Sequence, residues 1–151
     1  MPLPRPALLA AVAIAAGGLA TAPALAQSHP HYLKALTDLR LARALLQAPD
    51  TGRAEGFEKT VIDDIDQAIS ELRHAAIDDG KSLDDHPPID ANVSHKDRLH
   101  EILALVEGAG RGLAVDEDDQ KALGWRDRAV KDTADARAFV VAAINNEPPQ
   151  R

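Results

Sequence analysis

Hydrophobic residues recur every three or four positions along most of the chain after residue 27, and no stretch alternates apolar and polar residues with β-branched enrichment. Spacing of three and four places residues on one face of an α-helix, whereas strict alternation is typical of a half-buried strand. We therefore expect an all-α fold.

Proline, glycine and polar capping residues divide this pattern into helices. The first helix is expected over 30–48, because proline suits the first helical turn and the segment 48–52, which contains a proline and a glycine, ends the pattern. The second is expected over 57–79, with Gly80 as a left-handed C-terminal cap. Gly80 to Val93 should form a loop.

Two further helices are expected in the second half of the chain. Ser94 with Asp97 resembles a capping box, with aspartate in place of the usual Glu or Gln, and should open the third helix. The three glycines within 108–112 should fray its end, since glycine costs about 1 kcal/mol per helical position relative to alanine. The acidic run 117–119 suits the positive start of a fourth helix that continues to Asn146.

The apolar stripes predict the core, and the mostly short connections predict an antiparallel up-down-up-down four-helix bundle. Residues 33–39 echo 99–105, and 65–68 echo 134–137. A duplicated αα-hairpin and the general similarity of amphipathic helices both explain this echo. The stripe residues are Tyr32, Leu36, Leu39, Leu46, Val61, Ile62, Ile65, Ile69, Leu72, Ala76, Leu99, Ile102, Leu103, Val106, Ala109, Leu123, Val130, Val140, Val141 and Ile144.

Residues 1–26 are typical of a signal peptide. Arg5 is the only charge before an apolar run over 7–16, and small residues at 24 and 26 fit a cleavage site before Gln27. The run is too short and too rich in Ala and Gly to anchor a spanning helix. We therefore expect a domain over 27–151, without a membrane span, in the periplasm or outside the cell.

Composition narrows the classes of function. The chain has 24 acidic and 17 basic residues, a formal net charge of −7, which disfavours a nucleic-acid partner because phosphate binding needs clustered Lys and Arg. It has no cysteine, which removes thiol nucleophiles, haem attachment through CxxCH, Fe–S clusters and cysteine-bound zinc. Met1 is the only methionine and leaves with the signal peptide, so a His/Met haem bundle is also excluded.

Several short segments carry a resemblance to known proteins. The opening HPHYLKALTDLRLAR over 29–43, joined to AAIDDGK over 75–81 and DHPP over 85–88, resembles a group of small, secreted, uncharacterised bacterial helical proteins. The resemblance covers most of the chain after residue 26. It implies an exported helical bundle and supplies no activity, ligand or functional residue.

Arg43 and Arg137 fall inside the apolar stripes of the first and fourth helices. A charge that faces a core needs a carboxylate or several carbonyls as partners. Asp66 lies at the level of Arg43 when the first two helices are antiparallel, because each is about 20 Å from the same end. We predict that the pair fixes helix register; an internal anion or substrate site is the alternative.

The up-down-up-down topology would gather all six histidines at one end of the bundle, beside several aspartates. Imidazole and carboxylate together suit zinc, copper or nickel. The candidate ligands are His29, His86 and His95, with Asp79 or His31. No pair has a diagnostic metal spacing such as HExxH, so helix capping by these histidines is an alternative.

Motifs for catalysis are absent: the sequence has no GxSxG and no phosphate-cradling glycine loop. Trp125 should cover part of the bundle end, with an exposed anchor for a partner as the alternative. We therefore expect a non-enzymatic binding or interaction protein of the periplasm. The alternative is a periplasmic protein that binds a divalent metal through its histidines.

Overall fold

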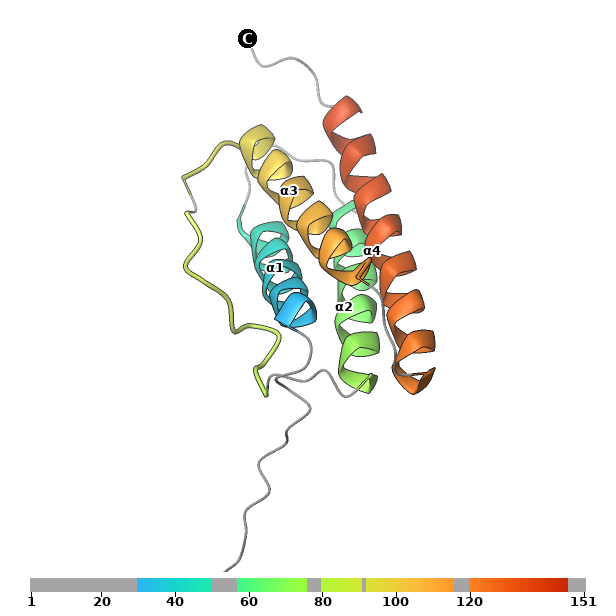
Figure 1. The fold of residues 1–151 in the computed structure, drawn as a ribbon. Coiled ribbons are helices and arrows are strands. Elements are labelled where there is room, and N and C mark those ends of the chain that lie inside the picture. Colours follow the sequence, from blue (N-terminus) through green and yellow to red (C-terminus); the bar gives the residue numbers. More distant parts are fainter. Residues whose placement is uncertain (1–29, 50–56, 76–79, 91, 116–119, 147–151) are drawn as a thin grey trace, which may run out of the picture.

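The computed structural model describes residues 30–49, 57–75, 80–90, 92–115 and 120–146. These residues form four α-helices and contain no strand, which confirms the all-α prediction. The helices pack side by side around one hydrophobic core, as Figure 1 shows. They are α1 (Pro30–Gln47), α2 (Phe57–His74), α3 (His95–Leu113) and α4 (Gln120–Asn146).

The predicted helix signals are found where the structure describes them. α1 begins at Pro30, and Gly80 has a φ of 71°, the left-handed conformation expected of it. The Ser94 hydroxyl accepts from the Asp97 backbone N–H at 3.2 Å and donates to the Asp97 carboxylate at 2.7 Å. This reciprocal cap fixes the start of α3. The predicted end of the second helix at 76–79 and the acidic run 117–119 lie outside the described residues.

The core follows the predicted stripes on the first three helices. All of the predicted α1 stripe is buried, as are most of the α2 and α3 stripes, whereas Ile62 and Leu103 are half-buried. α4 contributes smaller side chains than its predicted stripe implied, because Val130, Val141 and Ile144 lie at the edge of the core. Its fully buried residues are Ala122, Ala129, Thr133, Ala136 and Val140.

The order of helix directions differs from the predicted up-down-up-down arrangement. Arg98, in the first turn of α3, donates to the carbonyl of Ala48 just beyond the end of α1. At the other end of α3, Gly112 lies against the backbone of His31 at the start of α1. α3 is therefore antiparallel to α1 and parallel to α2, so the order is up-down-down-up (Figure 1).

The segment from Gly80 to Val93 makes this order possible. Figure 1 shows it running along the outside of the bundle, from the end of α2 to the opposite end, where α3 begins. An extended chain covers about 3.3 Å per residue, so this segment can reach about 45 Å, whereas an 18-residue helix is about 27 Å long. The crossing lets α1 pack mainly on α3 and α2 mainly on α4.

Helix propensity predicts that the glycines near the end of α3 fray it, and this prediction is wrong. Two of these glycines are sites where α1 packs closely against α3. A Cβ added at Gly112 would lie 2.9 Å from the carbonyl oxygen of His31, and one at Gly108 would lie 3.0 Å from Oδ2 of Asp38. Both glycines allow α1 to approach α3 closely, and α3 remains helical to Leu113. Packing therefore overrides intrinsic propensity here.

None of the helices in the described ranges has both the length and the apolar character that crossing a membrane requires.

Candidate functional site

The histidines do not meet at one end of the bundle. His95 lines a small cavity with Ala48 and Phe57, where α1 ends and α2 begins. His74 ends α2 and lies at the opposite end, and His31 lies there too, beside the end of α3. The single-pole prediction is therefore wrong for the described residues, because the crossing segment carries the start of α3 away from the end of α2.

The predicted metal ligands are only partly described. His29 and Asp79 lie outside the described residues. His86, on the crossing segment, places Nδ1 2.7 Å from the carbonyl oxygen of Pro87. No group of three or more His, Asp or Glu side chains in the described ranges is arranged to hold a metal ion. His31, His86 and His95 therefore do not form a common ligand set.

Arg43 and Asp66 are paired as predicted. Nε of Arg43 donates to Oδ1 of Asp66 at 2.7 Å, and the side chains are 14% and 34% exposed. Nη1 of the same arginine also donates to Gln47 at 3.1 Å and to Asp84 at 3.2 Å. The guanidinium thus joins α1, α2 and the crossing segment, which favours the structural reading of the pair over an internal anion site.

The most deeply buried arginines are ones that the helical wheels did not single out. Arg40 is 0% exposed and Arg98 is 5% exposed, whereas Arg137, predicted to face the core, is exposed and pairs with Glu107 at 2.8 Å. Nη1 of Arg98 donates to the carbonyl oxygens of Ala48 and Pro49, both at 3.3 Å. Arg98 therefore ties the start of α3 to the end of α1.

A groove between α3 and α4 forms a hollow on the described surface that could hold a ligand. Its volume is about 470 Å³, within the range of ligand sites, and it is open to solvent along one side. The groove exists between the two helices because small residues face each other there. The side chains and backbone that form its apolar lining belong to Val106, Gly110, Ala114, Val130 and Ala134.

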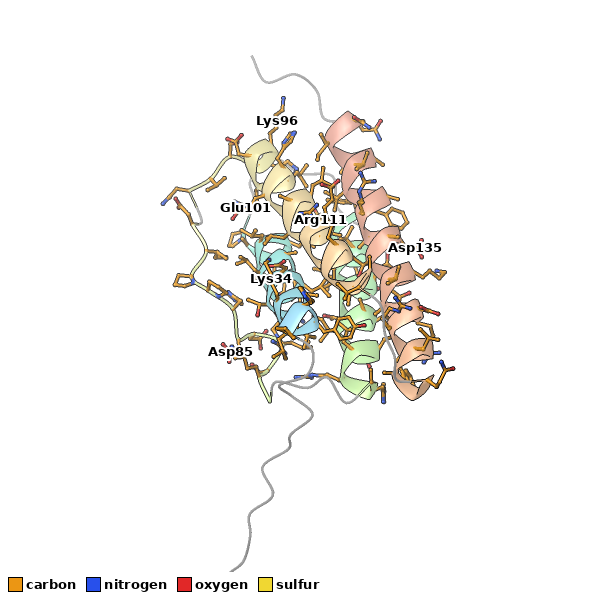
Figure 2. All side chains as sticks on the ribbon, viewed as in Figure 1. Lys34, Asp85, Lys96, Glu101, Arg111 and Asp135 are labelled. Carbon is orange, nitrogen blue, oxygen red and sulfur yellow. The ribbon has the colours of Figure 1, made fainter. Side chains whose placement is uncertain are left out.

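Charged side chains border this apolar lining. Glu107 of α3 and Arg137 of α4 both line the groove and are paired with each other across it. Arg111 also lines it, is exposed, and makes no ion pair with the described residues; Figure 2 labels it on α3. The Asp38 carboxylate lies nearby, since it and Arg111 Nη2 are both within 4 Å of a Cβ built on Gly108, but Asp38 is paired with Lys34. The rim thus offers one exposed arginine that makes no ion pair with the described residues.

Thr133 lies at the floor of the groove. It is 2% exposed, and its methyl carbon would be 3.8 Å from a Cβ added at Gly110. Within the described part of the chain, its buried hydroxyl oxygen has no hydrogen-bond partner. Leaving such a group unpaired costs about 1–3 kcal/mol.

Trp125 lies at the end of the bundle where α2 ends and α4 begins. The His74 ring stacks on it with centroids 4.6 Å apart, and the Arg128 guanidinium lies 4.1 Å from its ring centroid. Arg128 is held in turn by Glu71, with Nε 2.8 Å from Oε2. Through these contacts with His74 and Arg128, Trp125 joins α2 to α4 and covers part of the bundle end, as predicted.

Carboxylates also gather between α2 and α4. Burial raises the pKa of the Asp64 carboxyl, and the negative charges of Asp135 and Asp132 raise it further. Burial likewise raises the pKa of Asp132, although the Lys131 charge opposes this. Proximity of these acids makes their simultaneous ionisation unfavourable.

Comparison with known proteins does not place the chain in a family. No protein-family description matches the sequence, and neither curated proteins nor solved structures show significant similarity to it. The resemblance noted on the segments 29–43, 75–81 and 85–88 stays an expectation.

Sequence patterns alone did not reveal the groove. Its lining comes from two helices, and helical wheels treat each helix separately. One available signal was the spacing of Gly110 and Ala114, which puts two small residues on one face of α3. Another was Ala134, a small residue one turn after Val130 on α4.

Proposed function

We propose that this chain is an exported, non-enzymatic binding protein whose α3–α4 groove accommodates the apolar part of a ligand or partner. The observation that carries the proposal is the groove itself, about 470 Å³ with an aliphatic lining. Burial of apolar surface is worth about 25 cal/mol per Å², so such a surface gains stability when a partner covers it.

The polar groups around the groove support a binding role better than a catalytic one. Glu107 is occupied by Arg137, and Thr133 has its hydroxyl buried with no base at hydrogen-bond distance among the described residues. The groove therefore has the character of a recognition surface, in which a few polar groups orient an apolar contact.

Export is the second part of the proposal and rests on the charged start, apolar run and small-residue exit of residues 1–26. Mass analysis of the exported protein should give an N-terminus at Gln27. A retained Met1, or a first residue well inside α1, would contradict export by this signal.

Binding in the groove can be tested with a neutral apolar fluorophore, N-phenyl-1-naphthylamine, whose emission rises when it leaves water. We expect the purified protein to enhance its emission, and we expect Ala134→Trp, which fills the groove from an exposed position of α4, to abolish the enhancement. Equal enhancement by both proteins would show that the α3–α4 groove is not the binding surface.

A metal-binding role has no comparable support. His31, His86 and His95 lie on α1, the crossing segment and α3, and they belong to no group of three or more His, Asp or Glu side chains in the described ranges that could hold a metal ion. The other candidates, His29 and Asp79, lie outside the described residues. Zinc, copper or nickel binding stays a prediction of the sequence.

A further inference from the structure

The shape of the α3–α4 groove restricts what can fill it. The lining extends from Val106 to Ala114, two turns of α3 or about 12 Å. The groove is bounded by two antiparallel helices and open on its third side, where an acyl chain would remain half exposed to water. A helix, in contrast, presents three to four apolar side chains on one face over two turns and places them as a ridge in such a groove.

Charge around the groove differs in sign from the charge of the whole protein. The chain carries a formal net charge of −7, whereas the side chain on the rim without an ion pair is the cation Arg111. Salt at 0.15 M screens exposed charges beyond about 8 Å, so a ligand in the groove responds to Arg111 more than to distant carboxylates. A partner with a carboxylate beside its apolar face would complement this rim.

We propose that the α3–α4 groove docks an amphipathic helix of a partner protein, with acidic side chains that flank its apolar face and pair with Arg111. This inference rests on the proposed binding role of the groove and adds the structure and charge of the occupant. The small residues Gly110, Ala114 and Ala134 let the helix approach, and the Glu107–Arg137 pair closes one end of the contact.

Two labelled peptides test the charge preference by fluorescence anisotropy. Both are 15-residue helices with leucines at positions i, i+3, i+4 and i+7; the flanking positions are glutamates in one peptide and lysines in the other. The protein should bind the glutamate peptide about three- to tenfold more tightly, the effect of one exposed charge pair and its like-charge counterpart. Non-specific attraction to an acidic protein would give the reverse order.

Substitution of Arg111 separates local from overall electrostatics. Arg111→Glu should invert the preference, so that the lysine peptide binds more tightly. Lys59→Glu makes the same change of charge on α2, which does not border the groove, and should leave the order of the two peptides unchanged. If Arg111→Glu and Lys59→Glu shift the preference equally, the assigned role of Arg111 is wrong.

Groove-filling variants test the place of binding. Ala134→Trp and Gly110→Leu should each weaken both peptides more than tenfold while the circular dichroism spectrum stays helical; the second variant serves if the first fails to fold. Dodecanoate tests whether an acyl chain binds the groove instead of a helix. If dodecanoate binds and both peptides fail, the helix proposal is overturned while the groove remains a binding surface. If the two peptides, dodecanoate and N-phenyl-1-naphthylamine all fail to bind, the proposed binding function is wrong as well.

Discussion

Two glycines in the same helix should respond in opposite ways to replacement by alanine. Gly110 has room for a Cβ, which would lie 3.8 Å from the Thr133 methyl, an ordinary van der Waals contact. Gly110→Ala should therefore raise the free energy of unfolding by about 0.5–1 kcal/mol, the difference in helix propensity.

Gly112 has no such space, because α1 passes over it. A Cβ there would lie 2.9 Å from the His31 carbonyl oxygen and 3.6 Å from the Ala35 Cβ. A backbone oxygen cannot rotate away, so α1 and α3 must separate, and overpacking of this kind costs about 1–3 kcal/mol. After the gain in propensity, Gly112→Ala should lower the free energy of unfolding by up to about 2 kcal/mol.

Urea unfolding followed by far-ultraviolet circular dichroism measures both changes. Gly124→Ala on α4 is the matched control, since a Cβ there would contact only the Arg128 guanidinium at 3.8 Å, and it should stabilise the protein as Gly110→Ala does. Equal stabilisation by Gly110→Ala and Gly112→Ala would refute the close approach of α1 to α3. Negligible effects at both positions would indicate that the end of α3 is frayed after all.

Three further perturbations address the polar contacts. Arg43 and Asp66 should show a coupling of about 1 kcal/mol in a double-mutant cycle, because their ion pair is only partly buried; additive losses would mean that the pair does not form. Thr133→Val keeps the shape and removes a buried hydroxyl without a partner, so thermal unfolding should show stabilisation of about 1 kcal/mol, and a clear loss would show that the hydroxyl is bonded in solution. The pKa of Asp64 is higher in the folded state than in the unfolded state, so protonation of Asp64 favours folding. The stabilisation from protonated Asp64 is fully present below the unfolded pKa and is lost as pH rises through the folded pKa. Asp64→Asn should therefore stabilise the protein at pH 7, and its advantage over the parent protein should shrink as pH falls towards 4; an advantage that grows with acid would reverse the assigned direction.

The parts of the fold that local chemistry determines could be predicted from the sequence. The apolar stripe of α1, the Ser94 cap and the left-handed Gly80 depend on residues within a few positions of one another. The Arg43–Asp66 pair was predicted although the topology was wrong, because it requires only that α1 and α2 be antiparallel neighbours.

The direction of α3 could not be obtained in this way. Its connection is long enough both to turn back at one end and to cross the whole bundle, so the choice depends on which helix faces pack best. That choice moved His95 away from His31 and His74 and turned Gly112 from a predicted weak point of α3 into a contact with α1.

The binding role of the groove is tested most directly by amide chemical shifts of the ¹⁵N-labelled protein during titration with the glutamate-flanked helical peptide. The largest changes should lie along the groove, at Gly110, Ala114 and Ala134, and Arg111→Glu should reduce them. The exposed end of the bundle around His74 and Trp125 should change little. Shifts centred on His74 and Trp125, or no shifts along the groove at saturating peptide, would contradict the assignment of the α3–α4 groove as the surface that binds this peptide.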